Sequence, residues 1–317
     1  RPIYLDNAAT TAVDPRVIAA MSSCLGADGD FANPSSVSHV CGREASARVE
    51  RARAEVAALV NAAPEQILFT SGATEANNLA LLGAARFHRN RSRHIVTSRT
   101  EHPAVLDACR QLEREGCVVT YLKSGPAGIV EVEQVAAGKL PIDVQADAID
   151  LLSLTAHKLH GPKGIGALCV RREPRLGLVP LQFGGGQERG LRSGTLPTHQ
   201  IVGFGSAYRI ARESMSVEVP RIAGLREQLW RSVAAIPGVE LNGDPVRRVA
   251  GILNVTVDGV EGETLLLALA DLALSSGSAC ASLNAEPSYV LRALGRSDRL
   301  AQSSLRLSLG RFTTAGE

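Results

Sequence analysis

The chain has 317 residues, of which 45% are hydrophobic and 21% charged, so it is long enough for two domains or one large α/β unit with a packed core. Its formal net charge of +2 gives no electrostatic case for a nucleic-acid partner. The six cysteines form no CxxC pair, so neither a disulfide framework nor a metal site is expected. Because we find no signal-peptide pattern and no run as long as a membrane span, we expect a cytoplasmic protein.

In the first two thirds of the chain, short β-branched runs alternate with amphipathic stretches, which predicts βα units around a largely parallel sheet. The runs that read as strands are 66–70, 94–99, 117–122, 148–154 and 165–172. The helices between them are expected from near Glu75 through Leu82 and from Pro103 to Glu115.

The pattern changes after about residue 215. A long helix is expected at 221–235 and a Leu/Ala-rich helix at 262–270, with apolar strand-like runs at 249–259 and 304–310. We therefore predict a large domain at 15–215 and a small α+β domain made of residues 1–14 and 216–317.

One join in the sequence does not suit this architecture. Between "GIVEVEQV" and "AAGKLPIDV" the text passes from helix-like residues to a turn with no strand, where a further βα unit is expected. The sequence therefore predicts that residues are missing at Val135 and Ala136. They are either left out while the numbering runs on, or deleted in the protein.

Lysine is rare in this chain, with only four among 34 basic residues. A carbonyl cofactor needs an amine that can lose its proton, which lysine can do and arginine cannot. Lys123, Lys139 and Lys163 stand in turns, and "GPKG" lacks the spacing of a nucleotide P-loop. Lys158 ends a buried strand, where α/β sheets bind ligands, although an arbitrary lysine is most often a surface residue.

Two further segments stand at expected strand ends. In "FTSGATEANN" a strand, a small-residue turn and a helix start leave free N–H groups for an anion, and Thr74 adds a hydroxyl, although an ordinary βα turn reads the same way. Together with Lys158, this segment suggests pyridoxal 5′-phosphate (PLP). His102 also follows a strand, so it could stack on an aromatic cofactor and exchange protons, or be purely structural.

Two residues in the last quarter complete the candidate site. Cys280 lies among small polar residues in "LSSGSACASLNAEPSY", a setting that favours an exposed and reactive thiol. Arg306, in "SLRLSLGRF", could hold a substrate carboxylate with its planar fork.

Eight stretches in order along the chain carry a family resemblance: "YLDNAATT", "NPSS", "TSGATEANN", "TEHPAVL", "HKLHGPKGIGAL", "GGGQERGLRSGTLP", "SSGSAC" and "SLRLSLGRFTT". On these the sequence resembles the group I cysteine desulfurases of the NifS/IscS type. That resemblance implies an aspartate aminotransferase-like α/β fold (PLP fold type I), with a mostly parallel seven-stranded sheet in the large domain and a smaller α+β domain.

The resemblance also implies roles for individual residues. Lys158 would bind PLP covalently and shuttle protons, His102 would stack on the ring, Cys280 would be the nucleophile and Arg306 would clamp the substrate carboxylate. The residues that would bind the phosphate are Ala73, Thr74, Thr155 and His157, together with Thr195 reaching the neighbouring subunit of a homodimer.

The implied reaction converts L-cysteine to L-alanine and leaves a persulfide on Cys280, for delivery to an iron–sulfur scaffold or sulfur carrier protein and for tRNA thiolation.

One departure from the family pattern is clear. The family's aspartate facing the pyridine nitrogen belongs where the chain joins Val135 to Ala136, and neither Asp143 nor Asp147 fits its motif. The alternatives are another PLP enzyme, a selenocysteine lyase or an aminotransferase, and a catalytically silent sulfur-transfer scaffold.

Overall fold

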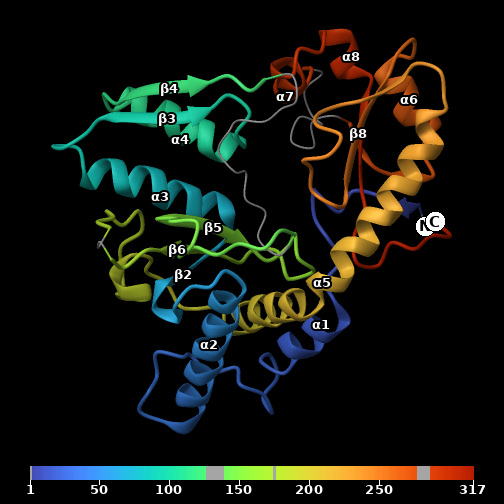
Figure 1. The fold of residues 1–317 in the computed structure, drawn as a ribbon. Coiled ribbons are helices and arrows are strands. Elements are labelled where there is room, and N and C mark those ends of the chain that lie inside the picture. Colours follow the sequence, from blue (N-terminus) through green and yellow to red (C-terminus); the bar gives the residue numbers. More distant parts are fainter. Residues whose placement is uncertain (1, 126–138, 174–175, 277–285) are drawn as a thin grey trace.

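The computed structural model describes residues 2–125, 139–173, 176–276 and 286–317 (Figure 1). The helices are α1 Pro15–Ser22, α2 Val40–Leu59, α3 Ala73–Phe87, α4 Pro103–Arg114, α5 Thr198–Ala234, α6 Gly262–Ala268, α7 Tyr289–Ala293 and α8 Asp298–Gln302. Short 3-10 turns lie at η1 Pro64–Gln66 and η2 Glu188–Gly190. Within these described ranges no helix combines the length and apolarity needed to cross a membrane.

The strands are β1 Ile3–Tyr4, β2 Ile67–Thr70, β3 His94–Ser98, β4 Val118–Leu122, β5 Leu151–Thr155, β6 Gly166–Val170, β7 Val239–Leu241, β8 Ile252–Val257, β9 Leu272–Ala273, β10 Ser275–Ser276 and β11 Ser304–Ser308. The strands and helices expected between residues 66 and 172 all form, with ends that differ from expectation by a few residues. Pro103 begins α4 as its first-turn position predicts.

Strands β2, β6 and β5 form a buried three-stranded sheet in that order. Strand β6 is antiparallel to both neighbours, so β2 and β5 run in the same direction. All four residues of β2 are buried, and Ile67 and Phe69 pack into a core formed with α2 and α5. This sheet brings the ends of β2 and β5 to the same edge.

The expected seven-stranded sheet is not formed by the described residues. Strands β3 and β4 pair in parallel in a separate two-stranded sheet. Figure 1 shows this pair above α3 and the β2–β6–β5 sheet below it. No described strand lies between β4 and β5 in the sequence, which is where the join at residues 135 and 136 falls. The described strands of this part of the chain therefore form two separate sheets, β2–β6–β5 and β3–β4.

The C-terminal part forms an antiparallel sheet in the order β10–β11–β8–β7, and β1 pairs with β9. Its core contains Leu253, Val255 and Leu305, with Trp230 of α5 packed against it. The helix predicted at 221–235 is wrong in its start, because α5 runs unbroken from Thr198. Its first half is buried in the core of the β2–β6–β5 sheet, so α5 is shared by both cores.

Candidate active site

Lys158 lies in a tight turn directly after β5, at the strand end where the sequence places it. The backbone N–H groups of Leu159 and Gly161 both donate to the carbonyl of Ala156, at 3.0 Å each. Thr155 is the last residue of β5, and its carbonyl accepts a hydrogen bond of 3.3 Å from the buried Tyr208 hydroxyl. Strand β5 and helix α5 together fix the position from which Lys158 projects.

Helix α3 begins beside this turn. Ala73 and Thr74 occupy its first turn, after Gly72 at the N-cap position, where no side chain caps the helix. A Cβ atom added to Gly166 of β6 would lie 2.7 Å from the Cα of Gly72. The two backbones are therefore in close contact, and the free N–H groups of the α3 N-terminus can receive an anion such as a phosphate.

The positive charge of Lys158 affects the pKa values of two histidines, His102 and His157. His102 is the N-cap of α4, where its Nδ1 accepts a hydrogen bond of 3.1 Å from the N–H of Ala104. Burial lowers the pKa of His102, and the positive charge of Lys158 lowers it further. Burial also lowers the pKa of His157, and the charges of Lys158 and Lys163 add to this effect. Helix α4 and the β5 turn thus bring His102 and Lys158 into one site.

Lys139 also belongs to this site, which the sequence did not reveal. The residue is half-buried. Burial lowers its pKa to about 8, and the charges of Lys158 and Arg306 add to this effect. The sequence placed Lys139 only in a turn, and no local pattern indicates which distant residues a turn will face. Three cationic groups therefore lie close to one another, which favours an anionic ligand.

Arg306 lies on β11, where one terminal nitrogen donates to Asp6 at 2.9 Å and to Ser275 at 3.3 Å. Its Nε is buried and has no hydrogen-bond partner among the described residues. A buried donor without a partner is costly. Because Nε makes none of these contacts, it is a donor that a substrate carboxylate can accept from.

The described structure does not test two of the predicted site residues. Cys280 lies outside the described residues. Thr195 lines a cavity of about 180 Å³ with Ser71, Arg192 and Gln200 of the same chain. Its predicted contact with a neighbouring subunit stays a prediction.

The residues present fit PLP in three respects: an amine at Lys158, an anion-binding helix N-terminus at α3, and a guanidinium with an orphaned buried donor at Arg306. Asp143 and Asp147 do not supply an acid for the pyridine nitrogen. Asp143 accepts hydrogen bonds from Asn61 and from the N–H groups of Gln145 and Ala146. Asp147 accepts from the N–H of Asp143. Both carboxylates are therefore already engaged in hydrogen bonds that stabilise the turn at residues 143–147.

A family model described as aminotransferase class-V matches residues 3–138 and 134–317. The cysteine desulfurase IscS of Aeromonas hydrophila subsp. hydrophila is 51% identical over 362 residues, covering 100% of this chain and 90% of the relative. A solved NifS-like protein has a TM-score of 0.89 at 30% identity, covering 99% of this chain and 95% of that one. DndA from Streptomyces lividans has a TM-score of 0.77 at 34% identity, covering 96% and 99%. These matches confirm the fold class.

The relatives carry residues that this chain lacks. The alignment with the Aeromonas protein spans 362 residues, whereas this chain has 317. The two matches to the family model meet at residues 134–138, which includes the join predicted at Val135 and Ala136. The family model is therefore interrupted at the join that the sequence predicted. The join lies outside the described residues.

Proposed function

Because this chain belongs to the aminotransferase class-V family, and within it to the group I cysteine desulfurases, we propose that it converts L-cysteine to L-alanine and transfers the sulfur to its own Cys280. Enzymes of this family depend on PLP. The cofactor, when bound, draws electron density away from the α-carbon of the amino acid.

The proposed roles follow the positions of the side chains. Lys158 holds the cofactor and moves the α-proton, and His102 packs against the ring. The α3 N-terminus at Ala73 and Thr74 holds the phosphate together with Thr155 and His157. Arg306 orients the substrate carboxylate through its Nε. Thr155, His157 and Lys158 come from the end of β5 and the turn after it, whereas the other groups come from the N-termini of α3 and α4 and from β11.

The sulfur-transfer step balances with one enzyme thiol. The Cys280 thiolate forms a bond to the sulfur of L-cysteine as the carbon–sulfur bond of the substrate breaks. The electron pair of that bond stays with the carbon, which takes up protons to give alanine, and Cys280 is left as a persulfide. A reducing thiol then releases the sulfur as sulfide.

The proposal extends to the oligomeric state, the sulfur acceptors and the division into domains. The working unit is a homodimer in which Thr195 reaches the partner's phosphate site, and the acceptors are an iron–sulfur scaffold or sulfur carrier protein in the cytoplasm. The division into a large domain at 15–215 and a small domain at 1–14 and 216–317 is supported by two separate hydrophobic cores.

The observation that most supports the proposal is that the charge of Lys158 lowers the pKa values of His102 and Lys139, which come from two other segments of the chain. The test is to incubate the PLP-loaded protein with L-cysteine and a reducing thiol, and to measure alanine and sulfide. We expect equal amounts of both products.

Two variants make this test specific. Cys280→Ala should abolish both products, whereas Cys41→Ala, at an exposed cysteine, should behave as the wild type. Sulfide release that survives Cys280→Ala would contradict the assigned nucleophile. A wild type that binds PLP and forms no alanine would instead favour the silent scaffold.

A further inference from the structure

The N-terminal segment 10–14 is bonded to the turn that carries Lys158. The backbone N–H of Thr11 donates to the carbonyl of His157 at 2.9 Å, and the N–H of Asp14 donates to the carbonyl of His160 at 3.0 Å. The side chains of Thr10 and His157 lie 3.2 Å apart, Oγ1 to Nδ1. Segment 10–14 therefore holds the turn on both sides of Lys158.

The Thr11 side chain connects His157, before Lys158, with His160, after it. Its hydroxyl donates to the carbonyl of His157 at 2.9 Å and accepts from the N–H of His160 at 2.8 Å. Thr11 is only 5% exposed, so water cannot readily replace these bonds. The turn needs this support because His160 has a φ of +60°, a left-handed conformation that is unfavourable for a residue with a side chain.

His160 is held in turn by both ends of the chain. Its Nδ1 lies 2.9 Å from the carbonyl of Ala12, and its Nε2 lies 3.4 Å from the backbone nitrogen of Arg311. The ring meets Phe312 edge to face, with centroids 5.1 Å apart. A neutral His160 that donates from Nδ1 and accepts at Nε2 satisfies both contacts.

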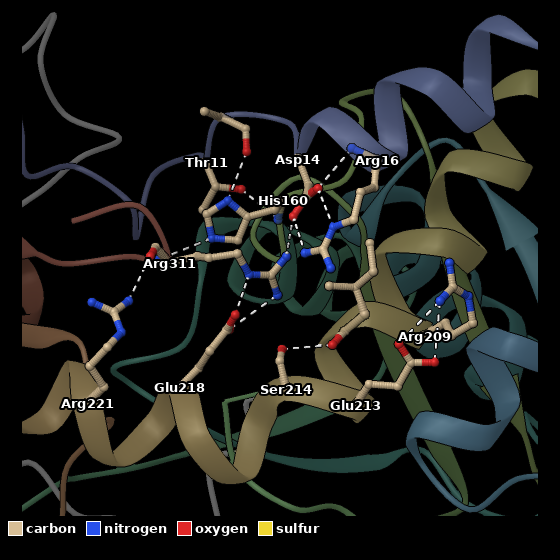
Figure 2. A network of polar contacts seen from close by, with 12 residues as sticks. Thr11, Asp14, Arg16, His160, Arg209, Glu213, Ser214, Glu218, Arg221 and Arg311 are labelled. Carbon is tan, nitrogen blue, oxygen red and sulfur yellow. Dashed lines mark hydrogen bonds and ion pairs between the residues drawn. The ribbon is translucent and has the colours of Figure 1, made fainter. Parts of the chain in front are cut away.

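A buried ion-pair network anchors segment 10–14. Figure 2 shows the guanidinium of Arg311 between the carboxylates of Asp14 and Glu218. The Arg311 to Asp14 distance is 2.9 Å, and their side chains are 8% and 3% exposed. Arg16 also donates to Asp14. Because a buried charged pair resists displacement, the segment is a rigid support for the Lys158 turn.

We propose that Thr11 is a positioning residue for Lys158, acting through the His157 carbonyl and the His160 N–H. The inference rests on the proposed function, since the amine being positioned is the one that binds PLP. It also gives a role to "NAATT", which the proposed chemistry leaves without one.

The test uses the PLP-loaded protein and the visible absorbance and circular dichroism of the bound cofactor. Both signals report how the Lys158 amine holds the ring. Thr11→Val removes the hydroxyl at nearly constant volume and leaves the His160 N–H without an acceptor, whereas Thr11→Ser keeps the hydroxyl. Thr256→Val is the matched control, because Thr256 is fully buried and its hydroxyl bonds Asn242 and Ser304 in the C-terminal sheet.

We expect Thr11→Val to shift the pH midpoint of the visible band, weaken its circular dichroism and lower kcat by on the order of tenfold or more, as misplaced catalytic groups do. Thr11→Ser should stay close to the wild type, and Thr256→Val should lose stability without changing the spectrum. If Thr11→Val does not fold, Thr11→Ala, which adds no methyl group facing polar atoms, gives the same readout.

The outcomes separate the two claims. A wild type that gains no visible band with PLP would overturn the proposed function, and this inference with it. A wild type with a normal band, next to a folded Thr11→Val or Thr11→Ala protein with the same midpoint and circular dichroism, would overturn the positioning role alone.

Discussion

Arg306 and Asp6 form an ion pair of 2.9 Å although 300 positions separate them in the chain. Ser275 completes the group by donating to Asp6 at 2.7 Å. These contacts fix one edge of the Arg306 guanidinium and leave its buried Nε without a described partner. An arginine held in this way can receive a carboxylate with little loss of side-chain freedom.

The first prediction concerns this arginine. Arg306→Gln should raise KM for L-cysteine by roughly 30-fold, about 2 kcal/mol, because charged hydrogen bonds to the carboxylate are lost. Cysteamine, which has no carboxylate, should be processed equally by variant and wild type. Arg110→Gln, at an exposed ion pair with Asp107, is the control. An unchanged KM for L-cysteine would remove Arg306 from the substrate site.

The second prediction concerns the pH dependence of Lys139 in protein stripped of PLP. Its folded-state pKa of about 8 lies below the ordinary value of 10.5, so the unfolded chain binds more protons between these values. Stability should therefore rise as the pH increases from 8 to 10.5. Lys139→Met should abolish this rise and stabilise the protein at pH 7 by about 1 to 3 kcal/mol.

Denaturant unfolding at several pH values measures this effect, with Lys123→Met, at an exposed lysine, as the matched control. In addition, Lys158→Ala should raise the pKa of Lys139, because one repelling charge is removed. A Lys139 amine that titrates near 10.5 in both proteins would place it away from the site.

The third prediction tests the support of the α3 N-terminus. Glu188, 2% exposed, accepts from Arg53 at 2.7 Å and from the N–H of Phe69 in β2 at 2.7 Å. Glu188→Gln should lower the free energy of unfolding by about 3 kcal/mol, because Arg53 loses its buried counter-charge and keeps only the exposed Glu50 as an ion-pair partner. Asp107→Asn, at an exposed pair, should cost no more than about 1 kcal/mol. If both variants lose the same free energy of unfolding, Glu188 does not support β2 and the α3 N-terminus in this way.

The fourth prediction concerns the close contact between β6 and the α3 N-terminus. A methyl group on Gly166 would meet the Leu154 carbonyl oxygen at 2.5 Å and Gly72 at 2.7 Å, and these backbone atoms cannot rotate away. Gly166→Ala should cost about 1 to 3 kcal/mol and weaken PLP binding. Gly224→Ala has open space around it and should be neutral or stabilising. PLP titration followed by absorbance distinguishes the two.

The sequence predicted local elements well and their pairing less well. Strands such as β2 and β5 are short apolar runs bounded by turns, and Pro103 begins α4, so these elements depend on nearby residues. The fold class was confirmed, but the described residues form a three-stranded and a two-stranded sheet in place of the expected seven strands. The start of α5 was missed because the burial of Phe204 and Tyr208 depends on distant partners.

The candidate site was likewise predicted where local motifs indicate it and missed where it depends on distant contacts. Lys158, His102 and Arg306 stand in recognisable motifs, the charge of Lys158 lowers the pKa of His102, and the Nε of Arg306 has no partner among the described residues. Lys139, Thr11 and Asp6 were given no role, since each acts through contacts with residues more than 15 positions away. Cys280 stays a prediction, because it lies outside the described residues.

The most direct measurement of the central claim is chemical trapping of the cofactor. The protein is loaded with PLP, reduced with borohydride, digested and mapped by mass spectrometry, which identifies the lysine that carries the pyridoxyl group. We predict that Lys158 alone among the four lysines is labelled. Label on Lys139 instead, or no stable label at all, would contradict the account.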